Sequence, residues 1–459
     1  MGVFRSITDT FTDRVFMRKT MYIALPVAMQ QLLNTVVNMI DTLMIGRLGE
    51  ISIAAVGLAN KVFFVFALLV FGISSGASVL GAQFFGAGDR PNVKRTLGVS
   101  LVIGLAGSLL FVLFVRLSPV GVMGIFTPSP ETKAIGAAYL AIACISYPFT
   151  AVSTIYVSLL RSVNRVKIAV ASSVMAICVN VSLNYILIFG KLGMPAMGVE
   201  GAALATLIAR VMEAAVILGY TYFGRTELAA GFRELLSLNR AFLKKYADTT
   251  LPVIANEFMW GLGTTVYSMA YGRMGDLAVA AITVAQTIHD LVFVMIHGLG
   301  AATAVILGNF MGADRLSEAE VYARKFIVLQ FGVSLALAAF CLLIRGPLIG
   351  FYNLTPEVAR SVSLCLAVFS MILIFKVFCN VQIVGILRSG GDTRFCLFAD
   401  VTSVWLIGVP MAFFGGLYLK LPIHLVYAMV CLEEVYKSVV CFFRYRQKKW
   451  LRNLSVTEE

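Results

Sequence analysis

Charged residues are scarce in this chain, and their scarcity excludes a soluble globular protein. Asp, Glu, Lys and Arg make up only 13% of the 459 residues, whereas 59% of the residues are hydrophobic. Soluble domains carry about a quarter of their residues as charged side chains. Histidine occurs only three times, and the eight cysteines form no CxxC pair. We interpret the cysteines as small buried apolar residues rather than as disulfides or metal ligands.

Sequence motifs of nucleotide-binding proteins and metalloproteases are missing as well. The chain contains no GxxxxGK[ST] phosphate-binding loop and no HExxH pattern, so we expect neither ATP hydrolysis nor a catalytic metal. We predict that the protein is not an enzyme and that it needs no cofactor.

Long apolar runs make up most of the chain. A helix needs roughly 20 apolar residues to cross a bilayer, and in lipid only helices or closed barrels satisfy the backbone hydrogen bonds. We therefore predict an all-α polytopic membrane protein with 12 transmembrane helices. The expected spans lie near residues 20–45, 53–82, 97–118, 133–160, 167–190, 198–223, 246–271, 278–308, 323–344, 358–387, 395–418 and 421–443.

The basic residues indicate how the spans are oriented. The net charge is +13, and most of the 37 Lys and Arg residues fall in segments on the same side as the N-terminus. This positive-inside bias predicts that both termini are cytoplasmic, and it accounts for the basic charge without a nucleic-acid partner. The first 19 residues are polar and do not resemble a cleavable signal sequence. We expect a multi-pass protein of the plasma (inner) membrane that acts as a monomer.

The chain contains an internal repeat with an offset of 226 residues. Residues 25–89 align without a gap to residues 251–315, and a repeat of this length decides the fold class. Each copy leads six expected spans, so the two halves share one orientation and we predict a pseudo-twofold axis along the membrane normal. The expected parts are an N-terminal six-helix lobe (1–223), a cytoplasmic linker with amphipathic spacing (224–245) and a C-terminal six-helix lobe (246–459).

One face of the first span is polar. Gln31, Asn34, Asn38 and Asp41 recur at helical spacing within an otherwise apolar run. A carboxylate inside a membrane is costly unless it faces a cavity or a partner, so Asp41 is a candidate functional residue. The alternative is that the amides only join neighbouring helices by hydrogen bonds.

Three further polar residues are candidates for the same site. Asn180 and Asn184 share one face of the fifth span, and Tyr139 lies in the fourth. With Asp41 they form a predicted cation- or proton-binding site, although plain packing remains the alternative for Tyr139.

The second copy of the repeat carries different chemistry. The offset of 226 places Glu257, Trp260, Thr264 and Tyr267 where the first copy has Gln31, Asn34, Asn38 and Asp41. Glu257 is therefore a second candidate acid in the other lobe. Lys376 in the tenth span is an attractive partner for it, and such a pair would make Glu257 partly structural.

The eighth span adds Gln286, His289, Phe293 and His297 at helical spacing. His289 and His297 are about 12 Å apart on a helix and cannot share one tetrahedral metal ion. We interpret the stripe as cavity-lining, with satisfied core histidines as the alternative, and we predict no metal site.

These observations favour ion-coupled secondary transport, and the motifs themselves resemble a known family. The relevant segments are Leu25-Pro26, NMIDTLMIGRLG (38–49), GAQFFGAGDR (81–90), NEFMWG (256–261) and GILRSGGDTR (385–394). They are similar to those of the multidrug and toxic compound extrusion (MATE) family, over essentially the whole chain. The resemblance implies two six-helix lobes around a cavity. It also implies export of amphiphilic, often cationic compounds, driven by inward flow of Na⁺ or H⁺.

The resemblance also implies roles for individual residues. Asp41 matches the acid that binds the coupling ion, and Pro26 matches a proline at which the first span bends. Tyr139, Asn180 and Asn184 match the polar residues around that acid, and Glu257 matches an acid used by another branch.

The chain departs from the family pattern in two places. No second carboxylate follows near Asn184, so a single titratable acid is expected at the site of Asp41. Lys376 stands close to where some relatives carry an acid, which favours the first lobe as the ion site.

Two other functions stay open from the sequence alone. A lipid-linked precursor flippase of the same superfamily would be expected to line its cavity with several arginines for a pyrophosphate. A channel or a non-transporting membrane scaffold would not need two different acids in its two halves.

Overall fold

The computed structural model of the protein describes residues 9–237, 239–350 and 354–456. In these ranges the regular structure is helical throughout. The first half contains α2 (Arg14–Gly46), α3 (Glu50–Gly86), α4 (Arg90–Leu117), α5 (Pro119–Gly124), α6 (Pro130–Ala143), α7 (Tyr147–Ser162), α8 (Val166–Phe189) and α9 (Gly198–Phe223). The second half contains α10 (Phe232–Leu235), α11 (Arg240–Gly272), α12 (Asp276–Gly312), α13 (Leu316–Gly350), α14 (Pro356–Asn380), α15 (Thr393–Ser403), α16 (Val409–Phe413), α17 (Ile423–Val430) and α18 (Leu432–Arg446).

Several helix boundaries follow from local sequence. Asp89 precedes α4 and accepts a hydrogen bond from the Asn92 backbone N–H at 3.1 Å, so it caps the helix. Ser129 caps α6 in the same way, with a proline at the first helical position. Gly190 ends α8 with φ of 65°, a left-handed conformation that favours glycine.

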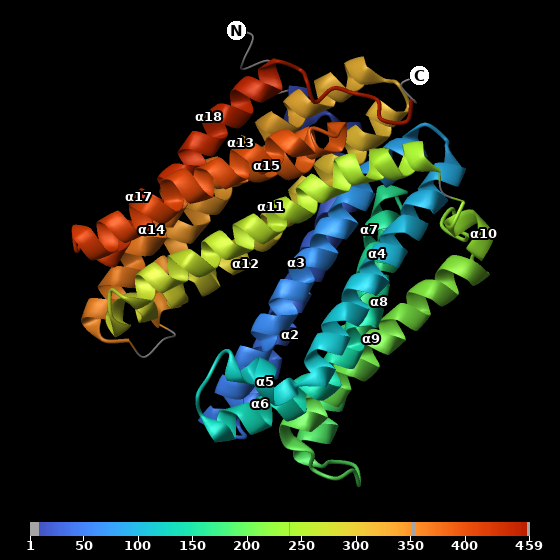
Figure 1. Cartoon of the computed structure of the whole chain (residues 1–459). Helices are drawn as coiled ribbons and strands as arrows, with labels where there is room; N and C mark the ends of the chain where they lie inside the picture. The colour runs from blue at the N-terminus through green and yellow to red at the C-terminus, as the bar shows by residue number, and fades with distance from the viewer. Residues whose placement is uncertain (1–8, 238, 351–353, 457–459) are drawn as a thin grey trace. The chain divides into compact units, whose positions relative to one another are not determined.

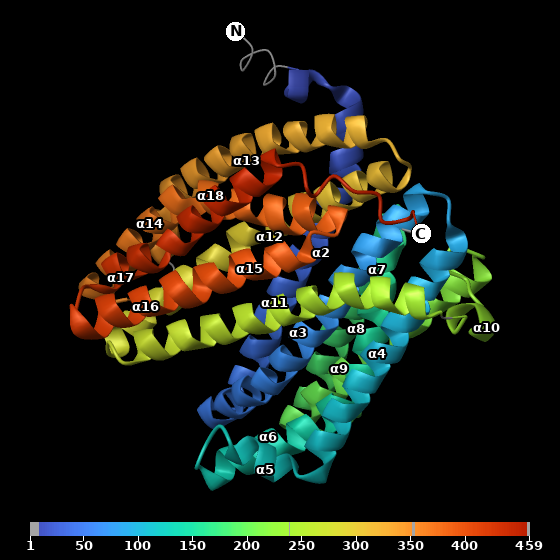
Figure 2. The same ribbon diagram turned by 45° about the horizontal axis from the view of Figure 1, so that its top comes forward.

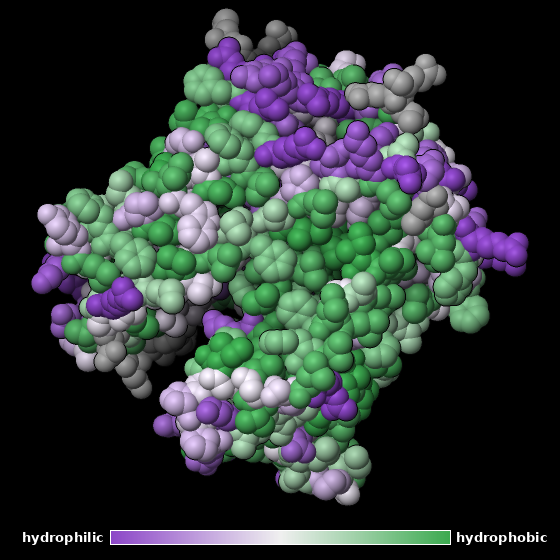
Figure 3. Space-filling model, viewed as in Figure 1, coloured by the Kyte–Doolittle hydropathy of each residue, from purple (hydrophilic) through white to green (hydrophobic). Residues whose placement is uncertain are grey.

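Each of the 12 expected spans coincides with helix in the structure. Ten helical segments are long and apolar enough to cross a membrane. The other two expected spans are α11, which carries Glu257 in its middle, and α17–α18, which are interrupted at Cys431. On the face shown in Figure 3, hydrophobic side chains cover the middle of the helices and hydrophilic ones gather near their ends. The predicted all-α, 12-span fold class is confirmed.

The chain divides into two compact units. The Asp41 unit consists of residues 29–81 and 89–254. The Glu257 unit consists of the described residues of 9–28, 82–88 and 255–456. In the Asp41 unit α8 and α9 run side by side (Figure 1), and in the Glu257 unit α13 lies along α14 (Figure 2). The division between units falls inside α2 and α11, after Ala28 and Ile254, which are repeat-equivalent positions. The lobe limits predicted from the sequence remain a proposal.

Each unit contains the same close helix crossing at equivalent places in the repeat. In the Asp41 unit Gly72 of α3 faces the start of α11, and a Cβ atom at Gly72 would lie 2.7 Å from the Ile254 Cα. In the Glu257 unit Gly298 of α12 faces the start of α2, where its Cβ would lie 3.1 Å from that of Ala28. Small residues allow helix backbones to approach closely in membranes, which explains why these glycines occur in both copies.

The segment predicted as a linker contains one short helix. Gly231 donates its backbone N–H to Glu234 at 2.9 Å, and Glu234 also pairs with Lys94 of α4 at 2.9 Å. Asn239 then accepts from the Phe242 N–H at 2.6 Å as α11 begins. Among the described residues of the linker, helix is therefore found at Phe232–Leu235 and again from Arg240, where α11 begins.

The first turns of α2 are held in the Glu257 unit by an aromatic cluster. Phe16 is fully buried, with ring centroids 5.6 Å from Tyr322 and 5.0 Å from Phe326. We predict that Phe16→Ala lowers the free energy of unfolding by about 3–5 kcal/mol because it leaves a cavity. The measurement is thermal unfolding in detergent, with Val15→Ala as control because Val15 is 59% exposed. Equal melting temperatures for the two variants would contradict this packing.

Candidate functional site

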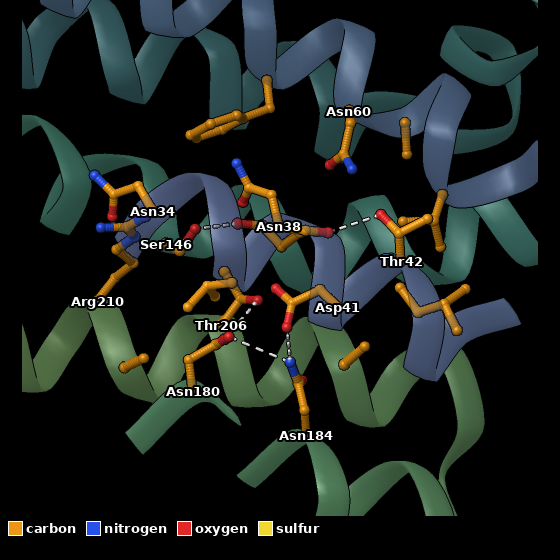
Figure 4. Close-up of a pocket in the computed structure, with 18 of the residues that line it drawn as sticks. Asn34, Asn38, Asp41, Thr42, Asn60, Ser146, Asn180, Asn184, Thr206 and Arg210 are labelled. Atoms are coloured by element: carbon orange, nitrogen blue, oxygen red, sulfur yellow. Dashed lines mark hydrogen bonds between the residues drawn. The ribbon is translucent and has the colours of Figure 1, made fainter. Parts of the chain in front are cut away.

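A cavity of about 480 Å³ lies inside the Asp41 unit, between α2, α3, α6, α8 and α9 (Figure 4). Six of the residues predicted from the sequence line it: Asn34, Asn38, Asp41, Tyr139, Asn180 and Asn184. Helical spacing explains why several of these residues face the cavity together. Asn34, Asn38 and Asp41 share one face of α2, and Asn180 and Asn184 are one turn apart on α8.

Asp41 is held by amide groups rather than by a basic side chain. The Asn184 Nδ2 donates to Asp41 Oδ1 at 2.6 Å and to Asn180 Oδ1 at 3.2 Å, while Asn180 contacts the Thr206 hydroxyl at 3.2 Å. The opposite orientation of the Asn180 amide would let it donate to both Asp41 oxygens at 3.3 Å. Within the described residues Asp41 forms no ion pair of 4.0 Å or less, so its negative charge is left for a ligand.

The side-chain oxygens at this place suit a small cation. Asn184 Oδ1 is buried and, among the described residues, accepts no hydrogen bond. It lies on the same amide that contacts Asp41, beside Asn180. Carboxylate and amide oxygens are the ligands that hard cations prefer, and a carboxylate can equally take a proton. The arrangement fits either Na⁺ or H⁺.

Two predicted residues have contacts other than those expected. Tyr139 is buried and lines the cavity, but its hydroxyl makes no hydrogen bond to Asp41 in the described structure. Gln31 does not line the cavity, and its Oε1 accepts from the Asn34 side chain at 3.3 Å.

The sequence interpretation missed an ion pair in the same cavity. Arg210 and Glu213 of α9 both line it, and Arg210 Nη1 lies 2.8 Å from Glu213 Oε2. The expectation of one titratable acid at this site is therefore wrong, because Glu213 lines the same cavity as Asp41. The signal was present, since two opposite charges three residues apart in an apolar run face the same side of a helix and point to an intramembrane pair.

A chain of hydrogen bonds continues from this ion pair. The Ser173 hydroxyl donates a hydrogen bond to Glu213 Oε1 at 2.8 Å and accepts one from the Gln30 side-chain amide at 2.5 Å. The Arg161 guanidinium in turn donates to the Gln30 side-chain oxygen. Both Glu213 oxygens are thus occupied, and the carboxylate is fixed in place.

The second candidate acid is paired, but with a different partner from the one expected. Glu257 Oε1 lies 2.9 Å from Arg388 Nη2, and both side chains are buried. Lys376 instead contacts Glu434 of α18 at 3.2 Å. The expected Glu257–Lys376 pair is therefore wrong, because α18 supplies an acid to Lys376 while Arg388, further along the same span, reaches Glu257.

Other buried polar groups of the Glu257 unit also bind one another. Lys437 Nζ lies 3.0 Å from Asp400 and 3.7 Å from Glu434, and the Asn256 amide donates to Asp400 at 2.9 Å. The predicted cavity residue Tyr267 is buried and donates its hydroxyl to Glu433. The acids of this unit are thus engaged in an internal network.

The remaining predicted residues belong to the Glu257 unit and do not line the Asp41 cavity. Thr264 donates to the Gly261 carbonyl of its own helix at 2.8 Å, and His289 Nδ1 contacts Asp290 at 3.0 Å. Trp260 is 43% exposed on α11, and Gln286 and Phe293 lie on α12, where the Phe293 ring centroid is 5.1 Å from that of His289. A cavity-lining role for these residues remains a prediction. The described residues include no group of three His, Cys, Asp or Glu side chains that could hold a metal.

Comparison with known proteins identifies the family. The MatE family model matches residues 26–186 and 252–414, which correspond to the two copies of the repeat. This chain belongs to the MATE family of transporters, and it is not an enzyme. Multidrug resistance protein MdtK of Edwardsiella ictaluri is 26% identical, over 86% of this chain and 87% of that protein. A probable multidrug resistance protein NorM of Thermotoga maritima is 23% identical, over 95% and 94%.

Solved structures share the fold. "MATE in the straight conformation" matches with a TM-score of 0.86 at 21% identity, covering 94% of this chain and 95% of that one. "MATE in the bent conformation" matches with the same TM-score and identity over 97% of each chain. A superfamily transporter from Pyrococcus furiosus, described as having a binding pocket of reverse polarity that suggests a different function, matches with a TM-score of 0.85 at 21% identity over 96% of each chain. The protein is therefore a multi-pass membrane transporter with the MATE fold.

The Glu257–Arg388 pair predicts a stability effect. Glu257→Gln leaves the buried guanidinium without its carboxylate, which typically costs about 3–5 kcal/mol. We expect a lower melting temperature in detergent, and partial recovery in Glu257→Gln/Arg388→Met. Glu131→Gln, an exposed change, is the control. If the Glu257 single variant melted like the control, the ion pair would have no structural role.

Proposed function

We propose that this transporter exports amphiphilic, often cationic organic compounds in exchange for H⁺ or Na⁺ that flows inward. The observation that carries the proposal is Asp41, a carboxylate inside a cavity that receives amide hydrogen bonds but forms no ion pair among the described residues. A negative charge of this kind attracts cations strongly because the surrounding helices are apolar. The multidrug resistance proteins among the relatives support the class of substrate.

Exchange follows if the coupling ion and the substrate compete for Asp41. A carboxylate that holds a proton or Na⁺ no longer attracts an organic cation, and a bound organic cation disfavours the coupling ion. The cavity volume of about 480 Å³ is in the range of small-molecule sites. Aromatic side chains add to the attraction of a lipophilic cation, and Phe63, Phe64 and Tyr147 line this cavity.

Alternating access needs an element that has two arrangements, and α2 is our candidate. Pro26 lies inside α2 and has no N–H to donate, which weakens the helix at that point. Asp41 lies on the same helix, four turns further on. Neutralising a buried carboxylate changes its desolvation cost by several kcal/mol, which is enough to shift a two-state equilibrium. We propose that the occupancy of Asp41 sets the bend at Pro26.

The other functions are less well supported. A pyrophosphate flippase would require several cavity arginines. Among the described residues that line this cavity Arg210 is the one arginine, and it is paired with Glu213. A channel would not need a neutralisable acid on the same helix as a potential hinge. We propose further that the transporter is a monomer with both termini in the cytoplasm.

Removing the Asp41 charge tests the ion site. We expect Asp41→Asn to abolish ethidium transport in everted membrane vesicles, because the variant lacks the carboxylate that binds both the coupling ion and the substrate. Glu50→Gln, the same chemical change at an exposed position outside the cavity, is the matched control and keeps the wild-type rate. Wild-type rates in Asp41→Asn would disprove the assignment.

Imposing the two gradients separately identifies the coupling ion. Either a pH gradient or a Na⁺ gradient is imposed across the membrane of vesicles that contain the wild-type protein, and ethidium transport is measured. We expect one gradient to drive transport and the other to have little effect. Equal transport without any gradient would favour the channel alternative.

A further inference from the structure

The charges that line the cavity can be counted because few ionisable side chains reach it. Among the described lining residues only Asp41, Arg210 and Glu213 carry a formal charge. When all three are ionised, the cavity holds two negative charges and one positive charge, a net charge of −1.

Arg210 and Glu213 neutralise each other in a fixed geometry. The guanidinium lies 2.8 Å from one Glu213 oxygen, and the Ser173 hydroxyl donates to the other at 2.8 Å. The Glu213 side chain is only 4% exposed, whereas that of Arg210 is 37% exposed. Both side chains line the cavity, and the guanidinium is the more accessible of the two to a ligand.

The next charged group is outside the cavity. Arg161 does not line it, and is separated from Glu213 by the hydrogen bonds through Gln30 and Ser173. It supports the position of the Glu213 carboxylate without adding a lining charge. Asp41 is thus the one negative charge of the cavity that is not already balanced.

We propose that Arg210 restricts the substrates of this transporter to organic cations with a single positive charge. The inference rests on the proposed function and names its substrate class. One positive charge on the substrate is balanced by Asp41. A second positive charge on the same molecule has no unpaired carboxylate to balance it and is repelled by the Arg210 guanidinium. A like charge in a desolvated site is a strong barrier to binding. H⁺ and Na⁺ are also monovalent, so each exchange of coupling ion for substrate leaves the occupied cavity neutral.

Ethidium and propidium test the proposal, because they share one ring system and differ in charge, +1 and +2. The assay is the initial rate of uptake into everted vesicles. We expect the wild-type protein to transport ethidium and to exclude propidium. Arg210→Gln gives the cavity a net charge of −2, and we expect the ratio of propidium to ethidium transport to rise at least about tenfold.

A second variant adds the charge without disturbing the ion pair. Asn60 of α3 lines the cavity, and Asn60→Asp changes it to a carboxylate of the same size. We expect the same gain of propidium transport, even if Arg210→Gln fails to fold. Arg210→Lys keeps the positive charge and should keep the exclusion of propidium.

The double variant separates charge from structure. Glu213→Gln alone leaves Arg210 unbalanced and the cavity neutral, so ethidium transport should fall at least about tenfold. Arg210→Gln/Glu213→Gln restores the net charge of −1, and we expect it to recover ethidium transport and to exclude propidium. A purely structural ion pair would also recover in the double variant, but it would lower ethidium transport in both single variants, whereas the cavity charge lowers it only in Glu213→Gln.

The outcomes distinguish this inference from the function on which it rests. Absence of ethidium transport in the wild-type protein would overturn the proposed function itself. Asp41-dependent ethidium transport together with unchanged propidium exclusion in Asn60→Asp would overturn only the role of cavity charge. Propidium transport by the wild-type protein would do the same.

Discussion

The proposed ion site depends on one hydrogen bond, from the Asn184 amide to the Asp41 carboxylate at 2.6 Å. A carboxylate among apolar helices is tolerated only when it has polar partners or a cavity to face. Here it has both, and its partners are neutral amides. The hydrogen bond therefore positions the carboxylate without cancelling its charge. The surrounding helices α2, α8 and α9 supply the cavity in which that charge acts.

The two units show what the repeat retained and what it changed. Close crossings through Gly72 and Gly298 occur at equivalent places, because both units need the same backbone approach. The candidate acids of the two units differ in their ion pairing. Asp41 forms no ion pair among the described residues, whereas Glu257 is paired with Arg388 in a network of buried charges. The copies therefore share a scaffold, and the difference in pairing favours the first as the place where a cation is exchanged.

Much of the fold could be predicted from sequence, because span length and hydropathy follow directly from the thickness of the bilayer. The polar faces that carry Asp41, Asn180 and Asn184 were also predictable, since periodicity places residues on a helix face, and the resemblance to the family suggested that the two faces meet. The partners of the buried acids in the second copy were not predictable. Whether Glu257 reaches Lys376 or Arg388 depends on the axial offset of packed helices, and the intervening residues 381–387 form a π-helix that changes the register. The Arg210–Glu213 pair was visible in the sequence but was not recognised as part of the site.

The central claim is that the coupling ion and the organic cation compete for Asp41. The most direct measurement is the affinity of the purified protein for tetraphenylphosphonium at increasing concentrations of H⁺ and of Na⁺. The account predicts that one of these ions weakens binding to the wild-type protein, and that the dependence is lost in Asp41→Asn together with most of the affinity. The same ion dependence in both proteins would contradict it.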